Sequence, residues 1–511
     1  MFKTPLVKKT LQMLALLLVV WGIGFYYEGQ FIVFVALLGI FAAIRGKNGL
    51  VISTMLFSVF CVMLNPYVLP RDEYFGKISK MAMLVLPFAM IVGGRVAKSE
   101  EKLPLNSIFL FLPAAFLSSM GGWVPVISYL KIVNFAVFIV GLILVSKGLD
   151  KKPEELFIIR VFIIAISAIL VYGSLAALAF PGVAYYTSLK NAVNNEGLVY
   201  AEEVYYNIAD NGMSLFSGIT IHSQFLGPAL ACLASFLLAD MLLVEQKMSK
   251  LHLAILLPMP VMLYMTRARV GVLAFLVLGA VTLFHMMPKA QLDEKTRRHL
   301  KNMLLFCAAV VVAGCLYAEH QDHAISRLIR KTNDTTDTRS LSEATTSSRM
   351  GAIAESMRDF NLNPMLGKGF QVSEKLLTKR LTHWQDFFSA AIEKGLLPTM
   401  LLGEVGLLGT ALFAYFLWKF FTECKKRKYI ATSSLMIVYL STNMAEATFF
   451  SPGGGGGFLW IVCVLGGFAI DMAVKAGASS TGGAATGGPS VKVGIVRNCV
   501  RRDIKRSRIR I

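Results

Sequence analysis

The chain consists of long apolar blocks separated by short polar connectors. The blocks hold roughly 16–25 residues with almost no charge, which is enough to span a bilayer core of about 30 Å. Lipid offers no partner to an exposed backbone amide, so such blocks have to be helices. The pattern predicts an all-α polytopic membrane protein with about 14 transmembrane helices. The blocks lie near 11–27, 30–44, 50–65, 78–94, 106–120, 127–146, 156–179, 217–243, 252–266, 269–287, 302–318, 396–422, 430–447 and 457–474.

Composition supports a membrane protein and argues against a nucleic-acid partner. Hydrophobic residues make up 55% of the chain and charged residues 16%, whereas soluble domains hold about a quarter charged residues. The net charge of +20 comes mainly from alternate connectors and the C-terminal region, as expected when cytoplasmic loops carry the cations. We therefore expect both termini to be cytoplasmic. The cationic connectors hold Arg45/Lys47, Arg95/Lys98/Lys102, Lys147/Lys151/Lys152, Lys247/Lys250, Lys289/Lys295/Arg297/Arg298 and Lys425–Lys428.

The polar stretches divide the chain into regions. The longest is a loop of mixed charge between spans 11 and 12, which the alternation of cations places outside the cytoplasm. Within it, Lys331–Thr346 has the composition of a mobile loop, while Ser348–Phe360 and Lys375–Ile392 have helical spacing. The loop contains no cysteine, so no disulfide framework is indicated. The expected regions are a bundle of spans 1–11 over 1–318 with a shorter outer loop near 181–216, the large loop over 319–395, spans 12–14 over 396–474, and a disordered basic cytoplasmic tail over 475–511.

Arginines at the outer membrane boundary are candidates for binding an anion. Arg267 and Arg269 lie between two apolar blocks with no room for a loop, on the side where topology does not call for cations. An arginine at such a boundary usually has a partner or a ligand, and a guanidinium binds a phosphate or diphosphate bidentately. The alternative is that one of the pair extends to lipid headgroups. Arg349 begins a helical piece of the large loop and is a further candidate, with solvated surface as its alternative.

Four acids and one histidine are candidates for proton transfer or support of the site. Glu393 lies where the large loop re-enters the membrane, where a partly desolvated carboxylate suits a general base. His383 lies upstream in the same loop and is the competing base. Glu404 lies inside an apolar block and Glu446 at the outer end of another; acids in such places are functional candidates, with a structural bond between helices as the alternative. His383 and Asp386 are close enough to share a helical face. We find no metal-ligand spacing and expect neither a metal nor another cofactor.

Five short segments in order over roughly 120–460 together resemble the O-antigen polymerase and O-antigen ligase superfamily. Leu401–Gly409 resembles that family's Glu-x-Gly-x-x-Gly helix, which follows the large loop. The segment Asn363–Phe370, after Ser348-Arg349, resembles its Pro-x-x-Gly-x-Gly-Phe turn. Each motif is short, and the order of the set carries the resemblance. The other three matching segments are Gly218–Gln224, Met265–Gly271 and Asn443–Glu446.

The resemblance implies a metal-independent glycosyltransferase at the outer face of a bacterial inner membrane. Its donor and acceptor would be undecaprenyl-diphosphate-linked glycans, and chain-length regulator or flippase proteins are candidate partners besides membrane lipids. The implied roles are diphosphate binding by Arg269, Arg267 and Arg349, base catalysis by Glu393 or His383, and support by Glu404 and Glu446.

Two departures from the ligase pattern favour a polymerase of an exopolysaccharide, capsule or O-antigen. Gly395-Leu396 stand where ligases carry a His-Asn pair, and Leu215 stands where they carry an arginine. An O-antigen ligase that transfers glycan to another acceptor remains one alternative. A transporter of polysaccharide or lipid-linked glycan is the other, although the chain shows no inverted repeat of its hydrophobic segments.

Overall fold

The computed structural model describes residues 5–27, 30–70, 75–92, 101–185, 216–266, 268–290, 292–302, 304–305, 341–372, 396–444 and 447–482. Within these ranges the chain is helical and contains no strand; a single isolated antiparallel bridge joins Leu64 to Thr220. The described part is therefore all-α, as the apolar blocks predict.

Seven helical segments of the described part are long and apolar enough to cross a bilayer, which makes this a multi-pass membrane protein. Two of them contain a π-helical turn, at Asp240–Glu245 and Thr282–Met286, and a third is built from α21 (Gly455–Trp460) and α22 (Gly466–Gly482), joined through such a turn at Ile461–Leu465. Besides the span built from α21 and α22, the set comprises α1 (Pro5–Tyr26), α6 (Pro125–Ser146), α7 (Pro153–Ala176), α10 (Ser223–Ala239), α13 (Arg269–Val281) and α19 (Leu397–Arg427). The two π-helical turns named first follow α10 and α13.

Further apolar helices match the other predicted blocks but are shorter or less regular. They are α2 (Phe31–Ile44), α3 (Asn48–Met63), α4 (Phe75–Val92), α5 (Phe111–Met120), α11 (Lys250–Leu256), α12 (Met259–Thr266) and α20 (Ile430–Thr442). The predicted block near 302–318 lies almost wholly outside the described residues. The count of fourteen spans therefore stays a prediction.

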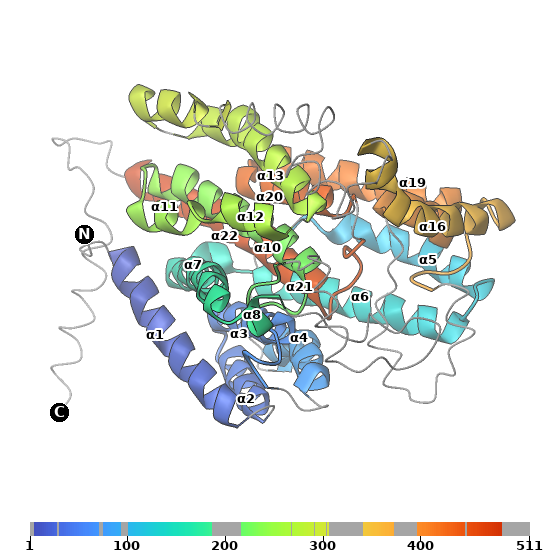
Figure 1. Cartoon of the computed structure of the whole chain (residues 1–511), viewed down its shortest axis with the longest axis horizontal. Coiled ribbons are helices and arrows are strands. Elements are labelled where there is room, and N and C mark those ends of the chain that lie inside the picture. The colour runs from blue at the N-terminus through green and yellow to red at the C-terminus, as the bar shows by residue number, and fades with distance from the viewer. Residues whose placement is uncertain are drawn as a thin grey trace.

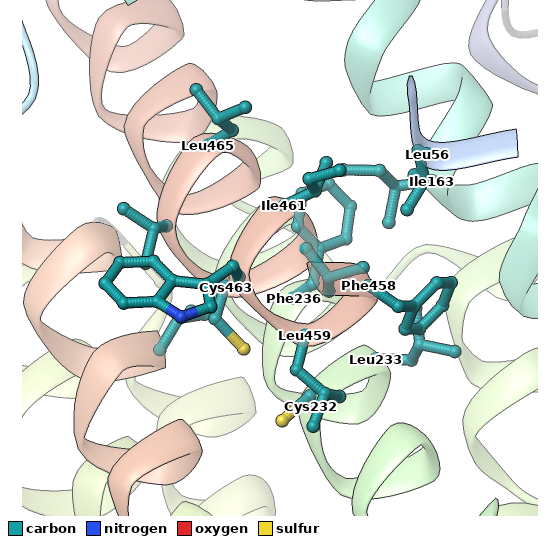
Figure 2. Packing of buried hydrophobic residues seen from close by; sticks show 14 of the residues in the cluster. Leu56, Ile163, Cys232, Leu233, Phe236, Phe458, Leu459, Ile461, Cys463 and Leu465 are labelled. Atoms are coloured by element: carbon teal, nitrogen blue, oxygen red, sulfur yellow. The ribbon is translucent and has the colours of Figure 1, made fainter. Parts of the chain in front are cut away.

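The helices pack around α10, whose apolar window is 94% buried, whereas that of α1 is only 17% buried. Accordingly, α1 lies at the margin of the bundle in Figure 1. Figure 2 shows side chains from four segments converging in the interior: Leu56 of α3, Ile163 of α7, Phe236 of α10 and Phe458 of α21. Lipid tails are as apolar as these side chains, so close packing rather than removal from water stabilises this contact.

The connectors gather at two ends of the bundle. We call the end that holds 64–70, 121–124 and 443–454 the outer end, and the end that holds 45–48 and 147–152 the inner end; the names follow the predicted topology. At the outer end the Asn65 N–H donates to the Ile219 carbonyl at 2.8 Å. At the inner end the Asn48 Nδ2 donates to the Val145 carbonyl at 2.8 Å. Contacts between connectors far apart in sequence thus fix both ends.

Two boundaries differ from those expected from the sequence. Helix α16 spans Leu341–Leu362, so the last part of the segment expected to be a mobile loop is helical. Ser340 and Glu343 have the spacing of a capping box, which favours a helix start within the Ser/Thr-rich composition. Helix α22 continues to Gly482, past the expected start of the tail at 475. Lys475 explains part of this extension, because its Nζ donates to Glu101 Oε1 at 2.7 Å.

Candidate functional site

The centre of the candidate site is a break in α19 that a turn of the large loop fills. In a regular helix the N–H groups of Leu407 and Leu408 would donate to the carbonyls of Gly403 and Glu404, four residues earlier. Instead, Leu407 donates to the Pro364 carbonyl at 2.8 Å and Leu408 to the Met365 carbonyl at 3.2 Å. Both N–H groups released by the break are therefore satisfied by the loop.

The carbonyls released by the same break are also satisfied by the turn. The Gly403 carbonyl accepts the Lys368 N–H at 2.9 Å, and the Glu404 carbonyl accepts the Gly369 N–H at 3.0 Å. Four backbone hydrogen bonds between 364–369 and 403–408 thus replace two that the helix lacks. Buried backbone groups need such partners, so the turn is an integral part of the membrane bundle at this point.

Glycines make this close approach possible. Gly406 has φ +62° and ψ −165°, a region that only glycine adopts without strain. A side chain there would also collide with the Met365 carbonyl group. Gly367, at φ +72° in the facing turn, lies against the Glu404 carbonyl group in the same way. Two of the motifs singled out in the sequence, Asn363–Phe370 and Leu401–Gly409, therefore form one structural unit.

Serines of α5 and α6 hold the turn from its other side. Ser118 Oγ donates to the Glu404 carbonyl and accepts the Gly369 N–H at 3.1 Å, so it joins both partners of the unit. Ser128 Oγ donates to the Phe370 carbonyl at 2.6 Å. All five residues of these contacts are buried. The sequence analysis did not single out these serines; the signal was the polar pair Ser118-Ser119 within a predicted span.

The end of the turn is tied to the loop before α21. Gln371 Nε2 donates to the Phe450 carbonyl at 2.6 Å, and Lys131 Nζ donates to the Gln371 carbonyl at 2.7 Å. Below this contact the Phe450 ring stacks on Phe111 with 5.3 Å between centroids and meets the edge of Phe370 at 5.1 Å. The aromatic packing gives the polar turn a rigid base.

Helix α16 lies along α19 next to this unit, as Figure 1 shows on the right of the view. The helices approach closely at Gly403, where a Cβ atom would lie 2.5 Å from the Ser356 carbonyl oxygen. Trp123 Nε1 donates to Asp359 Oδ1 at 3.4 Å. Arg349 lies in the first half of α16, so its backbone belongs to this helix; its side chain is outside the described part.

Glu404 is nearly fully buried, with 1% of its surface exposed. It lies at the break of α19, where its own carbonyl accepts hydrogen bonds from both Ser118 and Gly369. The structure thus places this acid inside the bundle directly beside the docked turn.

Arg269 begins α13 at the place where this helix crosses α10. Gly227 of α10 and Gly271 of α13 are so close that a Cβ on Gly271 would lie 2.8 Å from the Gly227 backbone. The preceding Thr266 Oγ1 accepts the Ala268 N–H at 3.2 Å. His222 caps α10, since its Nδ1 accepts the Gln224 N–H at 3.2 Å. Gly227, three residues after the segment Gly218–Gln224, therefore contacts the segment Met265–Gly271, although the Arg269 side chain and all of Arg267 lie outside the described residues.

Asn443 joins the fifth segment to the start of α19. Its carbonyl accepts the Leu397 N–H at 3.0 Å, and its Oδ1 accepts the Phe449 N–H at 2.7 Å. Because Phe449 precedes Phe450, the same loop contacts both the turn and the end of α20. Glu446 lies outside the described residues, as do Glu393 and His383, so the structure joins Asn363–Phe370 to Leu401–Gly409 but does not place the candidate bases.

Within the described ranges no group of three or more His, Cys, Asp or Glu side chains has the arrangement to hold a metal ion. The site therefore consists of backbone groups, serines, one buried acid and the ends of several helices. Comparison with known proteins adds nothing to this description: no family model, no curated protein and no solved structure matches the chain.

Proposed function

We propose that this chain is an integral membrane glycosyltransferase that polymerises undecaprenyl-diphosphate-linked oligosaccharide repeat units at the outer face of the bacterial inner membrane. One observation carries the proposal: the turn Asn363–Phe370 completes the broken helix at Gly403–Leu408 through four backbone hydrogen bonds. These are two of the segments that resemble motifs of the O-antigen polymerase and ligase superfamily. Their dependence on each other supports a shared role.

The docked turn would position the rest of the site. On one side it follows α16, which carries Arg349, and on the other it leads into 373–395, which contain His383 and Glu393. The turn thus joins the helix that carries Arg349 to the segment that carries the two candidate bases. In the proposed arrangement Arg269, Arg267 and Arg349 bind the donor diphosphate, while Glu404 and Glu446 support the site.

The proposed reaction is a glycosyl transfer between two lipid-linked chains. A hydroxyl of the acceptor glycan attacks the anomeric carbon of the donor, and the bond from that carbon to the diphosphate oxygen breaks. The hydroxyl proton passes to Glu393 or His383, and undecaprenyl diphosphate leaves with the bonding electron pair. Arginines that stabilise the charge on this leaving group would supply the larger part of catalysis, and the base a factor of roughly 10²–10⁴.

A second candidate function rests on a different observation, a buried ion cluster in the inner half of the bundle. Arg160 Nε lies 2.5 Å from Asp240 Oδ1, and its Nη2 lies 3.0 Å from Glu245 Oε1. His252 Nε2 lies 3.0 Å from Asp240 Oδ2. Ionisable side chains inside a membrane bundle often mark ion or proton pathways. This cluster favours a proton-linked transporter of lipid-linked glycan as the alternative.

Chain extension by purified protein separates these functions. Undecaprenyl-diphosphate-linked oligosaccharide extracted from the producing cells is incubated with the reconstituted protein, and the products are resolved by gel electrophoresis. A polymerase gives a ladder from the donor pool alone, a ligase gives product only when a separate acceptor is added, and a transporter gives none. We expect Arg269→Ala to abolish the ladder and Lys425→Ala, an exposed cation at the other end of the bundle, to leave it intact. A full ladder from Arg269→Ala would disprove the role of that arginine.

A further inference from the structure

A basic hollow lies at the inner end of the bundle, between two connectors that are far apart in sequence. The turn 45–47 between α2 and α3 and the segment 151–155 at the start of α7 line a cavity of about 480 Å³. Lys152 fixes the two walls to each other, because its Nζ donates to the Gly46 carbonyl at 2.7 Å and to Asn48 Oδ1 at 2.8 Å. Part-buried hydrogen bonds therefore hold the two walls of the hollow together.

The lining of the hollow is positively charged. Arg45, Lys47, Lys151 and Lys152 face two carboxylates, Glu154 and Glu155, which leaves a formal excess of two positive charges.

Glu155 is directed away from the opening. The residue is 4% exposed, and its Oε2 accepts the Gly49 N–H at the start of α3 at 2.9 Å. Its Oε1 also lies 3.6 Å from Lys47 Nζ. The carboxylate thus accepts a hydrogen bond from the N-terminus of α3, where a negative charge is favourable. Glu154 is the other carboxylate that lines the hollow.

An apolar helix face leads into this hollow. Five exposed side chains of α2 recur at helical spacing and so share one face: Phe34, Leu37, Leu38, Phe41 and Ile44. Arg45 follows directly, and its guanidinium carbon lies 4.2 Å from the centroid of the Phe41 ring. The apolar face and the basic hollow are therefore continuous, with Arg45 at the boundary between them.

We infer that the hollow binds an anionic phospholipid, with the headgroup phosphate among Arg45, Lys47 and Lys151 and the acyl chains along α2. A free phosphate would use the cations alone, whereas a phospholipid uses the cations and the adjoining apolar face. Basic pockets between membrane helices are suited to such headgroups. The site lies at the opposite end of the bundle from the proposed glycosyl-transfer site and does not depend on that function.

The test measures lipid binding to the purified full-length protein. Phosphatidylglycerol and phosphatidylcholine are titrated separately in detergent, and bound lipids are counted by native mass spectrometry. Arg45→Ala/Lys151→Ala removes two cations without touching the wall contacts of Lys152. Lys425→Ala/Lys426→Ala removes the same charge from the inner end of α19, outside this hollow. At about fivefold per cation, the first pair should weaken binding of phosphatidylglycerol about 25-fold, and the control pair should change it little.

A variant that should bind phosphatidylglycerol more tightly separates a loss of the site from a loss of the fold. Glu154 is exposed at the edge of the hollow, so Glu154→Gln should tighten phosphatidylglycerol binding, a result that a misfolded protein would not give. Inorganic phosphate at millimolar concentration should not displace the lipid. The inference would be overturned by equal binding of phosphatidylcholine, by an equal loss in the Lys425/Lys426 control, by unchanged binding in Glu154→Gln, or by displacement with inorganic phosphate, which would indicate a site for free phosphate.

Discussion

The backbone N–H of Leu407 donates to the carbonyl of Pro364 at 2.8 Å, rather than to Gly403 in its own helix. A segment of the large loop thus replaces a missing turn of a membrane helix. Inside a bundle the helix and the turn depend on each other, because neither the broken helix nor the turn can satisfy its backbone groups alone. Loop and helix should therefore form or separate together.

Replacing Gly406 should release the turn. Gly406→Ala places a side chain at φ +62° and ψ −165°, against the Met365 carbonyl group. The backbone strain alone costs about 1–3 kcal/mol, and the collision adds to it. We expect a lower melting temperature in detergent. We also expect faster trypsin cleavage after Lys368, because its N–H would lose the hydrogen bond to the Gly403 carbonyl.

Gly351→Ala is the matched control for this change. Gly351 lies in α16, where an added Cβ meets no atom within 4 Å. Alanine in a helix interior is favoured over glycine by about 1 kcal/mol, so this variant should keep or raise the melting temperature. Equal behaviour of the two variants would contradict the role given to the Gly406 conformation.

The sequence predicted the helices of this unit but not the contact between them. An apolar block located α19, helical spacing located the part of α16 over Ser348–Phe360, and the resemblance to family motifs singled out Asn363–Phe370 and Leu401–Gly409. Hydrogen bonds between two backbones leave no such periodicity, since any residue supplies the same N–H and carbonyl groups. The docking of Pro364 onto Leu407 therefore became visible only in three dimensions.

The sequence also indicates one buried ion pair. Arg160 and Asp240 lie within predicted spans, where charged residues are costly and usually paired; their opposite charges indicated a pair, although not which helices it joins. Ser118 was less visible, because serine is common where membrane helices pack closely. The candidate bases Glu393 and His383 remain predictions, since they lie outside the described residues.

Removing the Ser118 hydroxyl should weaken the same docked turn from the side of α5. Ser118→Ala leaves the buried Gly369 N–H without one of its two acceptors and the Glu404 carbonyl without one donor. The two backbone groups keep their hydrogen bond to each other, so each lost bond to Ser118 should cost only the net value of a hydrogen bond, about 0.5–1.5 kcal/mol. Ser58→Ala is the control, because the buried Ser58 Oγ makes no hydrogen bond within the described part of the chain. Thermal unfolding in detergent should show destabilisation in the first variant only.

The Glu101 cluster should make stability depend on acid pH. Burial raises the pKa of Glu101, but hydrogen bonds from Lys475 and Tyr429 and the charges of Lys475 and Arg427 outweigh it, so the pKa lies below its ordinary value of 4.5. A carboxyl group with a lowered pKa stabilises the fold above about pH 4.5, and this contribution is lost as the pH falls through the lowered value. Melting temperatures between pH 7 and pH 3 should fall less steeply for Glu101→Gln than for the parent protein. Parallel pH profiles would show that this cluster contributes no pH dependence.

The Arg160 cluster provides the strongest stability test, because removing one partner leaves a buried charge. Asp240 is fully buried and lies between Arg160 and His252. Arg160→Met should destabilise the protein by about 3–5 kcal/mol, since the Asp240 carboxylate then loses its bidentate partner. In Arg160→Met/Asp240→Leu both charges of this pair are gone, and apolar side chains of similar size should recover part of that loss; the rest reflects His252 and Glu245, which lose their contacts with Asp240 and Arg160. Lys247→Met removes the exposed partner of Glu245 and should change the melting temperature little. If the double variant were as unstable as Arg160→Met, the cost would lie in packing, and the ion pair would not be the feature that holds α7 to α10.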